Sequence, residues 1–245
     1  MGRTRTTEGP LIVYGANPVL ELLRSGAPVE RVLLGEGPRQ AELRTAARER
    51  GVPVAESDRA TLARAAGGAH HQGAVAVSPP FSYAPLERVL SPTSKTILVL
   101  DGIQDPRNLG AILRTARAAG VEGVVMPRDR SVGVTPVVAT ASAGLIFGVP
   151  IARVPNLVRA LEQAKRAGFW VIGLVPTASQ ALYGLEVPPR PALVVGGEGE
   201  GLRALVRRAC DFLVSLPMAA GVESLNVAVA TGIALYEIRR QRASL

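Results

Sequence analysis

Apolar residues follow two patterns along the chain. In some stretches they form short continuous runs, and in others they recur every three or four positions. Continuous runs bounded by glycine, proline or polar residues predict buried strands, whereas the longer spacing predicts helices with one buried face. In the first third of the chain the two patterns alternate. They predict helices at 17–23, 40–50 and 58–66 and strands at 29–34, 52–55 and 73–77.

The same alternation returns at residue 96 and continues to the C-terminal end. Strands are expected at 96–100, 123–126, 169–175 and 192–195, and helices at 108–119, 156–167, 202–208 and 224–242. The strands are continuous apolar runs, which indicates that both of their faces are buried. Strands of this kind, alternating with helices, are typical of a parallel sheet with helices on both sides. The predicted fold class is therefore α/β.

A segment rich in proline and serine, at 79–95, separates the two alternating regions. Proline fixes its own φ and moves the preceding residue away from helical angles, so this segment is expected to be a linker with one short helical turn. The chain then divides into a basic tail at 1–10, a small α/β domain at 11–78 and a larger α/β domain at 96–245.

The composition indicates a globular chain and favours a polyanionic partner. Hydrophobic residues make up 47% of the chain and charged residues 20%, which is enough apolar material for packed cores. The 28 basic and 20 acidic residues leave a net charge of +8. This charge favours nucleic acid as a partner, although basic surfaces also occur on proteins that bind none.

Several kinds of site are disfavoured by the residue types present. The single cysteine, Cys210, excludes a disulfide within the chain and argues against a thiolate metal site. His70 and His71 are adjacent, so their side chains point in different directions, and no metal site is expected. The chain has neither a secretory signal nor an apolar run long enough to span a bilayer. A soluble, cytoplasmic protein is therefore expected.

Three short segments of the second region carry the candidate chemistry, and each begins where an apolar strand is expected to stop. Ligands of parallel α/β sheets gather at the carboxyl ends of the strands, so a common site is expected. In the first segment, 105–116, Asn108 is a candidate N-cap. One face of its helix is apolar, with Leu109, Ile112, Leu113 and Ala116. Arg107 and Arg114 lie opposite and Arg117 at the edge, either as a solvated face or as contacts to phosphate or RNA.

The second segment, 194–202, is a glycine-rich turn after a strand. Residues 199–204 fit the G-x-G-x-x-A variant of the dinucleotide fingerprint. Too few residues follow for a dinucleotide-binding half, and Glu198 and Glu200 would repel a pyrophosphate. The glycines would still let a ligand approach bare backbone. An NAD-dependent dehydrogenase is therefore disfavoured.

The third segment, 216–226, leads into a strongly apolar helix. Ser224 is a candidate N-cap. The helix that follows has apolar residues on more than one face, so it is expected to pack against something beyond its own domain. A dimer interface is the favoured interpretation.

Together the segments resemble the three motifs of the SpoU family, RNA 2′-O-methyltransferases of the SPOUT superfamily. Residues 108–116 are similar to motif one, 196–202 to motif two, and 216–218 with 224–226 to motif three. The upstream region also resembles a known domain, the ribosomal-protein-like RNA-binding domain of the family's 23S rRNA guanosine enzymes, through residues 12–19 and 70–75.

The resemblance implies a small RNA-binding domain followed by a parallel-sheet domain with a C-terminal trefoil knot. It implies S-adenosylmethionine as cofactor and a homodimer formed through the C-terminal helix. The implied cofactor contacts, largely through backbone, are Gly196, Leu216 and Leu225, with Met218 nearby. The implied residues of the reaction centre are Asn108, Arg114, Glu198, Ser224 and Asn226.

The implied chemistry is in-line transfer of a sulfonium methyl group to a ribose 2′-hydroxyl, which loses its proton as it attacks. The family proposal assigns the base to the residue matching Arg114. Because a guanidinium does not deprotonate in proteins, we interpret Arg114 as a clamp that orients a phosphate and stabilises the developing alkoxide. Asn108 and Glu198 would position Arg114 or the ribose, and Ser224 with Asn226 would fix the loop of motif three.

The favoured substrate is a guanosine in 23S rRNA, either free or in a precursor ribosomal particle. Alternatives are a tRNA or another rRNA nucleotide, and a non-catalytic RNA-binding or ribosome-assembly protein that keeps the fold. The upstream domain has few aromatic residues, so it is expected to hold RNA by shape and phosphate contacts. The candidate RNA contacts are Arg31, Arg39, Arg44, Arg48, Arg107 and Arg117.

Overall fold

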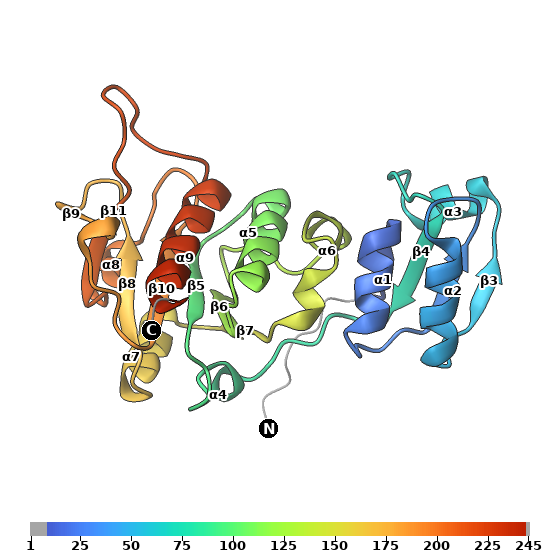
Figure 1. Ribbon diagram of the computed structural model, residues 1–245, viewed down its shortest axis with the longest axis horizontal. Helices are drawn as coiled ribbons and strands as arrows, with labels where there is room; N and C mark the ends of the chain where they lie inside the picture. The colour runs from blue at the N-terminus through green and yellow to red at the C-terminus, as the bar shows by residue number, and fades with distance from the viewer. Residues whose placement is uncertain (1–8, 244–245) are drawn as a thin grey trace. The chain divides into compact units, whose positions relative to one another are not determined.

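The structure of this protein is a computed structural model that describes residues 9–243 (Figure 1). Most of the basic tail expected at 1–10 lies outside the described residues, as do residues 244–245. Contacts divide the chain into two compact units. One contains the described residues up to Ser82 together with Gly133–Gly148, and the other contains Tyr83–Val132 and the described residues from Val149 onward.

The first unit is built on a four-stranded sheet in the order β1-β4-β2-β3. The strands are β1 (Leu11–Tyr14), β2 (Arg31–Leu34), β3 (Val54–Glu56) and β4 (Ala74–Ser78). β4 runs antiparallel to both β1 and β2, and β2 runs parallel to β3. The helices are α1 (Ala16–Arg24), α2 (Gln40–Glu49) and α3 (Arg59–Ala65). The predicted alternation of helices and strands is confirmed, and β1 is an additional strand.

A segment from the middle of the second alternating region packs with the first unit. It contains the helix α6 (Pro136–Ala141) and the 3-10 turn η1 (Leu145–Gly148). The hydroxyl of Thr140 donates to the carbonyl of Tyr14 at 3.3 Å, and the rings of Phe81 and Phe147 are 6.2 Å apart. Gly144 has φ +83 and packs so closely that a Cβ there would lie 2.8 Å from the carbonyl oxygen of Pro18. The chain therefore contributes to the first unit twice.

The second unit is built on a seven-stranded sheet in the order β7-β6-β5-β10-β8-β11-β9. The strands are β5 (Ile97–Asp101), β6 (Gly123–Pro127), β7 (Ile151–Val154), β8 (Trp170–Leu174), β9 (Gln180–Ala181), β10 (Pro191–Gly196) and β11 (Phe212–Ser215). Each recorded strand pair is parallel. Every residue of β5, β6 and β10 is buried, which confirms the predicted parallel sheet with two covered faces.

Helices of the second unit are placed by their apolar faces. They are α4 (Leu86–Val89), α5 (Pro106–Ala118), α7 (Leu157–Arg166), α8 (Ala204–Arg208), α9 (Val227–Ala243) and the 3-10 turn η2 (Leu182–Gly184). α5 buries the apolar face predicted from its sequence, with Leu109, Ile112, Leu113 and Ala116 each 0% exposed. α5 and α9 lie side by side (Figure 1). The trefoil knot implied by the resemblance stays a prediction.

The N-caps of α5 and α9 differ from those predicted. α5 begins at Pro106, and the carboxylate of Asp105 accepts from the backbone N–H of Arg107 at 2.7 Å, so Asn108 is not the cap. Proline fits the first helical turn, because its φ is already helical and its missing N–H would have no partner there. α9 begins at Val227, and Oδ1 of Asn226 accepts from the N–H of Ala228 at 2.9 Å. The N-cap prediction for Ser224 is therefore wrong.

Arg190 fastens the segment before β5 to the second unit. Its guanidinium donates to the carbonyls of Ser91, Ser94 and Ala167 at 3.0, 3.1 and 2.5 Å. The guanidinium carbon also lies 4.1 Å from the centre of the Phe169 ring. These carbonyls lie outside the strands, and the guanidinium donates to all three, although the carbonyl of Ser91 also accepts from the backbone N–H of Ser94 at 2.9 Å. Among the described residues, no helix is both long and apolar enough to cross a membrane.

Candidate functional site

The three candidate segments lie at one edge of the second sheet. β5 ends at Asp101, β10 at Gly196 and β11 at Ser215, and the segments follow these carboxyl ends. Figure 1 shows the long loop between β11 and α9 rising from this edge. The expectation of a common location is confirmed, because parallel strands end on the same side of a sheet.

Asn108 joins the three segments by hydrogen bonds. Its Nδ2 donates to Oε1 of Glu198 at 2.5 Å, and its Oδ1 accepts from Nδ2 of Asn226 at 3.1 Å. The first pair is 90 positions apart in the chain and the second pair 118. Asn108 lies in the first turn of α5, where it is half-buried, and Asn226 caps α9. Three of the five residues expected at the reaction centre therefore form one connected group.

A pocket of about 310 Å³ lies beside this group. All four predicted cofactor contacts line it: Gly196, Leu216, Met218 and Leu225. Glu198, Ser224 and Asn226 line it as well, whereas Asn108 and Arg114 do not. Its apolar wall comes from the ends of β8 and β10 and the start of α9, with Leu174, Val175, Val195 and Val227.

The glycines of the second segment are required by close backbone packing. A Cβ on Gly196 would lie 2.1 Å from the carbonyl carbon of Gly201, and one on Gly197 would lie 2.2 Å from the carbonyl oxygen of Gly102. The loop closes on itself, since the N–H of Gly201 donates to the carbonyl of Gly197 at 3.3 Å. Part of the pocket wall is thus bare backbone, which a ligand can approach closely.

Arg114 stands on the exposed side of α5, with Arg107 and Arg117. The structure does not bring Arg114 into the pocket lining or into a recorded hydrogen bond with Asn108 or Glu198. In the described part of the chain no carboxylate is recorded as an ion-pair partner of these three arginines, so their charges face solvent. The helix face predicted to be polar is confirmed, and a role for Arg114 in chemistry stays a prediction.

Two of the candidate RNA-binding arginines in the first unit are held by carboxylates. Arg39 donates through Nε and Nη2 to Glu42 at 2.7 and 2.9 Å, and Arg44 donates to both carboxylate oxygens of Glu56, at 2.9 Å to Oε2. The hydrogen bond from Arg39 lowers the pKa of Glu42, and the one from Arg44 lowers the pKa of Glu56. Each of these two guanidinium groups therefore has a carboxylate beside it, and Glu42 also accepts from Arg24 at 2.6 Å.

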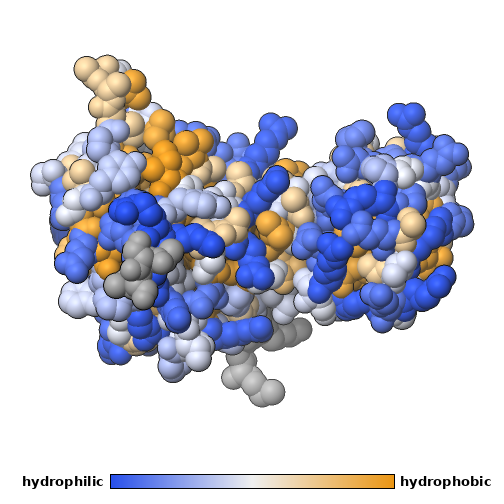
Figure 2. Space-filling view, viewed as in Figure 1, coloured by the Kyte–Doolittle hydropathy of each residue, from blue (hydrophilic) through white to orange (hydrophobic). Residues whose placement is uncertain are grey.

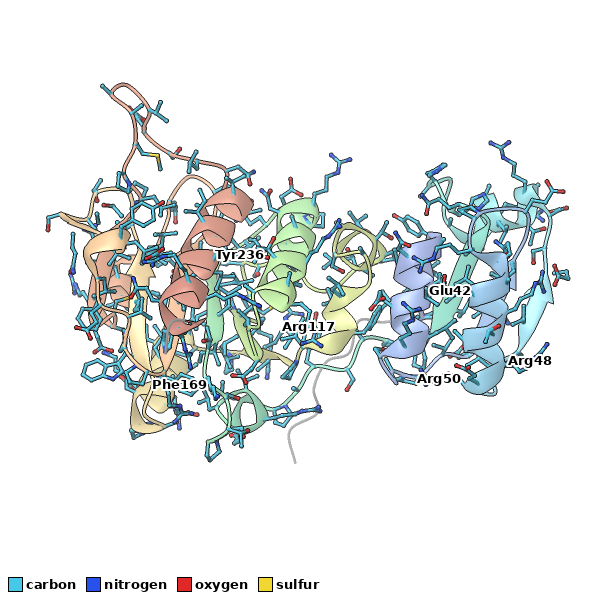
Figure 3. All side chains as sticks on the ribbon, viewed as in Figure 1. Glu42, Arg48, Arg50, Arg117, Phe169 and Tyr236 are labelled. Carbon is cyan, nitrogen blue, oxygen red and sulfur yellow. The ribbon has the colours of Figure 1, made fainter. Side chains whose placement is uncertain are left out.

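Arg31 and Arg48 differ from that pair. Both are exposed, and no carboxylate partner is recorded for either among residues 9–243. Figure 3 shows Arg48 near the C-terminal end of α2. Glu56, the partner of Arg44, comes from β3, so sequence pattern alone could not have shown that pairing. Glu42 follows Arg39 by three positions in the first turn of α2, a spacing that the sequence could have shown.

Further charged residues, which were not predicted from the sequence, lie at the same edge of the sheet. Asp101 is buried at the end of β5 and accepts a hydrogen bond from the guanidinium of Arg203 at 2.6 Å. An acidic residue closing an apolar strand was the signal that could have identified it. Arg128 and Arg130 are exposed in the loop directly after β6. A charged run after a predicted strand would have placed them at this edge.

The single cysteine, Cys210, does not line the pocket. Burial raises the pKa of the Cys210 thiol to about 12, so the thiol stays protonated at neutral pH. Its Sγ donates to the carbonyl of Val206 at 3.3 Å. Within the described ranges, no group of three histidine, cysteine or acidic residues is arranged to hold a metal ion.

Comparison with known families gives two matches that together cover most of the chain. Residues 95–236 match the model of the SpoU rRNA Methylase family. Residues 12–84 match the model described as RNA 2′-O ribose methyltransferase substrate binding.

Known proteins of similar sequence and structure carry both regions. The 23S rRNA (guanosine-2′-O-)-methyltransferase RlmB of Pseudomonas putida is 43% identical over 239 residues, which cover 94% of this chain and 96% of that protein. An uncharacterized tRNA/rRNA methyltransferase of Mycolicibacterium vanbaalenii is 41% identical over 252 residues, with 99% and 80% covered. The SpoU methyltransferase AviRb from Streptomyces viridochromogenes, solved in complex with AdoMet, superposes with a TM-score of 0.83 at 27% identity, with 97% and 92% covered.

Gly196→Ala tests the packing of the pocket wall. The added Cβ would overlap the backbone of Gly201, so the loop must move. Overpacking of this kind lowers the free energy of unfolding by about 1–3 kcal/mol. Thermal or urea unfolding measures the change. Gly184→Ala is the control, because nothing lies within 4 Å of a Cβ added there. Equal stability of the two variants would contradict the packing described for Gly196.

Proposed function

The chain belongs to the SpoU rRNA methylase family, and we propose on that premise that it methylates the ribose 2′-hydroxyl of a guanosine in 23S rRNA, with S-adenosylmethionine as methyl donor. The observation that carries the proposal is the hydrogen-bonded group of Asn226, Asn108 and Glu198 at the rim of the pocket. A non-catalytic RNA-binding protein would need a basic surface but not this connected group beside a pocket.

The residues of the pocket fit S-adenosylmethionine better than a phosphate-bearing cofactor. Glu198 is the one charged residue among the described residues that line it, and no arginine or lysine does. A dinucleotide would require donors for its pyrophosphate, whereas a carboxylate and apolar walls suit a sulfonium cation and an adenine ring. When bound, S-adenosylmethionine supplies an electrophilic methyl group. Gly196, Leu216 and Leu225, with Met218 nearby, are the residues that would hold it.

The polar group beside the pocket orients the ribose. The side-chain amide of Asn108 donates to Oε1 of Glu198. Oε2 of Glu198 can then accept a hydrogen bond from a substrate hydroxyl. Asn226 holds the other end of the Asn108 amide and also caps α9, so the amide is fixed from both sides. Ser224 lines the same pocket in the loop before α9. Positioning of this kind reduces the entropy lost in reaching the transition state.

Arg114 supplies the positive charge that the reaction needs near the 2′-oxygen. Its guanidinium stays protonated, so it stabilises the alkoxide that develops on the 2′-oxygen and orients the neighbouring phosphate. The exposed position of Arg114 on α5 leaves it free to meet an RNA strand. The RNA substrate and the methyl donor therefore bind at the same edge of the sheet, but the RNA phosphate requires positive charge and the sulfonium requires negative charge.

Arg114→Ala is expected to reduce kcat for methyl transfer by about 100- to 1000-fold, the effect of losing one charge-stabilising donor. The affinity for S-adenosylmethionine should stay unchanged, because Arg114 does not line the pocket. The measurement is transfer of label from S-adenosylmethionine to an unmodified 23S rRNA transcript, with tRNA transcripts in parallel and the methylated nucleotide mapped.

Arg166→Ala is the matched control, an exposed arginine in the last turn of α7. Transfer to tRNA alone would contradict the proposed substrate but keep the enzyme class. Absence of cofactor binding in the wild-type protein would favour the non-catalytic alternative. Cofactor binding without transfer to either transcript would move the proposed substrate to a precursor ribosomal particle, which the same assay can test. We also propose that the protein acts in the cytoplasm, where a ribosomal substrate would be met.

We propose that the RNA backbone contacts the exposed arginines that have no carboxylate partner among residues 9–243. In the first unit these are Arg31 and Arg48, and on α5 they are Arg107 and Arg117. Arg39 and Arg44 are already paired with carboxylates, so phosphate would have to displace a bound partner.

Arg48→Ala should weaken RNA binding and lower the slope of log affinity against log salt by about 1, because one phosphate contact is lost. Arg39→Ala should change the slope less, since Arg39 is already paired with Glu42. Filter binding to an rRNA fragment at several salt concentrations measures both. An equal loss in the two variants would contradict the assignment.

The exposed side of α9 is proposed as the contact between two copies of this chain. Val229, Ile233 and Tyr236 are 52%, 36% and 51% exposed and recur at helical spacing. The opposite side of α9 is buried, with Ala234, Leu235 and Ile238 at 1% exposure or less. Figure 2 shows apolar surface in this region, and Figure 3 shows Tyr236 on the helix. A helix that is apolar on both sides needs a second partner, and a twofold contact supplies one.

Tyr236→Glu is expected to convert the dimer to a monomer, because a charge would be buried without a partner in the interface. Light scattering after size-exclusion chromatography measures the mass. Tyr183→Glu is the control, since Tyr183 is 54% exposed but lies on η2, outside α9. A monomeric wild-type protein, or a variant that remains dimeric, would contradict the proposed interface.

A further inference from the structure

Asp101 is a buried carboxylate in an otherwise apolar strand. Its side chain is 0% exposed, and the preceding residues of β5, from Ile97 to Leu100, are buried hydrophobic residues. A buried charge is costly unless it is paired and hydrogen-bonded. Here Oδ1 accepts from Nε of Arg203 at 2.6 Å, and Oδ2 accepts from the backbone N–H of Arg203 at 2.9 Å. Both carboxylate oxygens of Asp101 therefore accept hydrogen bonds from Arg203.

Asp101 also holds the other end of the glycine-rich loop. Its carbonyl accepts from the N–H of Gly197 at 2.9 Å, the first residue after β10. Asp101 and Gly196 are register partners in the parallel pair of β5 and β10. The loop from Gly197 to Arg203 is thus fastened at its start and at its end to a single residue of the neighbouring strand.

Glu198 lies inside this loop, next to its first fastened residue. Glu198 follows Gly197 directly and accepts from Asn108 at 2.5 Å. Arg203 directly precedes α8, so its position also sets where that helix begins. Asp101 and Arg203 do not line the pocket, and neither is recorded in contact with Asn108. The hydrogen bonds of Asp101 therefore connect it to the site through the loop.

We propose that Asp101 is a positioning residue for methyl transfer, which clamps the two ends of the loop 197–203 so that Glu198 meets Asn108. The inference rests on the proposed function and adds to it a residue outside the pocket. The clamp explains why a charge is buried at this point: an apolar residue could fill the space but could not hold the N–H and guanidinium of Arg203.

A second aspartate with the same kinds of donor gives a comparison; its side chain is 24% exposed and its donors belong to two residues. Asp211 accepts from Nζ of Lys165 at 2.7 Å and from the backbone N–H of Val171 at 2.8 Å. It therefore also joins a side-chain cation and a backbone N–H. It lies before β11, away from the candidate segments, so its loss should affect stability without moving Glu198.

The test compares Asp101→Asn with Asp211→Asn in the full chain. Asparagine keeps the size of the side chain but has one oxygen, so it can retain only one of the two hydrogen bonds from Arg203. For Asp101→Asn we expect kcat to fall by about tenfold or more, because small displacements of positioned groups are costly to catalysis. The dissociation constant for S-adenosylmethionine should change by less than about threefold, since the strand ends and the bond from Gly197 to the Asp101 carbonyl remain. For Asp211→Asn, kcat should stay within about twofold of wild type.

Hydrogen exchange of the amides of 198–202 provides a readout that needs no RNA. It should become faster in Asp101→Asn and stay unchanged in Asp211→Asn. Arg203→Ala is the second variant if Asp101→Asn fails to fold, because its side chain is 38% exposed and its backbone hydrogen bond remains. It should show the same direction in both measurements.

The two proposals fail in different ways. If wild-type protein transfers a methyl group neither to the two transcripts nor to a precursor ribosomal particle, the proposed function is overturned, while faster exchange confined to 198–202 in the clamp variants still supports the clamp as a structural feature. If wild-type protein is active and Asp101→Asn keeps its kcat, or if Asp211→Asn loses as much kcat as Asp101→Asn, the positioning role of Asp101 is overturned.

Discussion

The parallel pairing of β10 with β5 is the constraint on which the candidate site depends. It sets Gly196 opposite Asp101, so the loop after one strand begins beside the loop after the other. Gly197 lets the backbones of these two loops approach to a distance that a Cβ would not allow, and Gly196 lets the second loop fold back closely on Gly201. With that approach, Glu198 reaches Asn108 across 90 positions of sequence. A shift of β10 by one residue relative to β5 would turn the side chains of β10 to the opposite face of the sheet.

The proposed function brings two ligands of different charge to this edge, where the charged groups of the protein are separated. The pocket is apolar and carries a carboxylate, whereas the exposed side of α5 carries Arg107, Arg114 and Arg117. A net charge of +8 therefore describes the chain but not the pocket. The local arrangement, rather than the overall charge, decides which partner binds where.

Long elements of the second unit could be predicted because their periodicity is a local property. The apolar face of α5 and the continuous strands β5, β6 and β10 are of this kind. Short elements such as β9, with two residues, have too few positions to show a period. The N-caps were wrong because Asp105 and Asn226 compete with Asn108 and Ser224 for the same role, and only backbone geometry chooses between them.

By itself the sequence determined the α/β class, the three segments and several residues of the pocket, because hydrophobic spacing, glycine and motif residues can be read within short stretches of the chain. Tertiary structure decided which side chains meet. The pairing of Arg44 with Glu56 and the packing of Gly133–Gly148 with the first unit depend on distances through space. So does the burial of Asp101 against Arg203. The physical reason is that hydrogen bonds and ion pairs require contact, and contact between distant positions is created only when the strands take their order in the sheet.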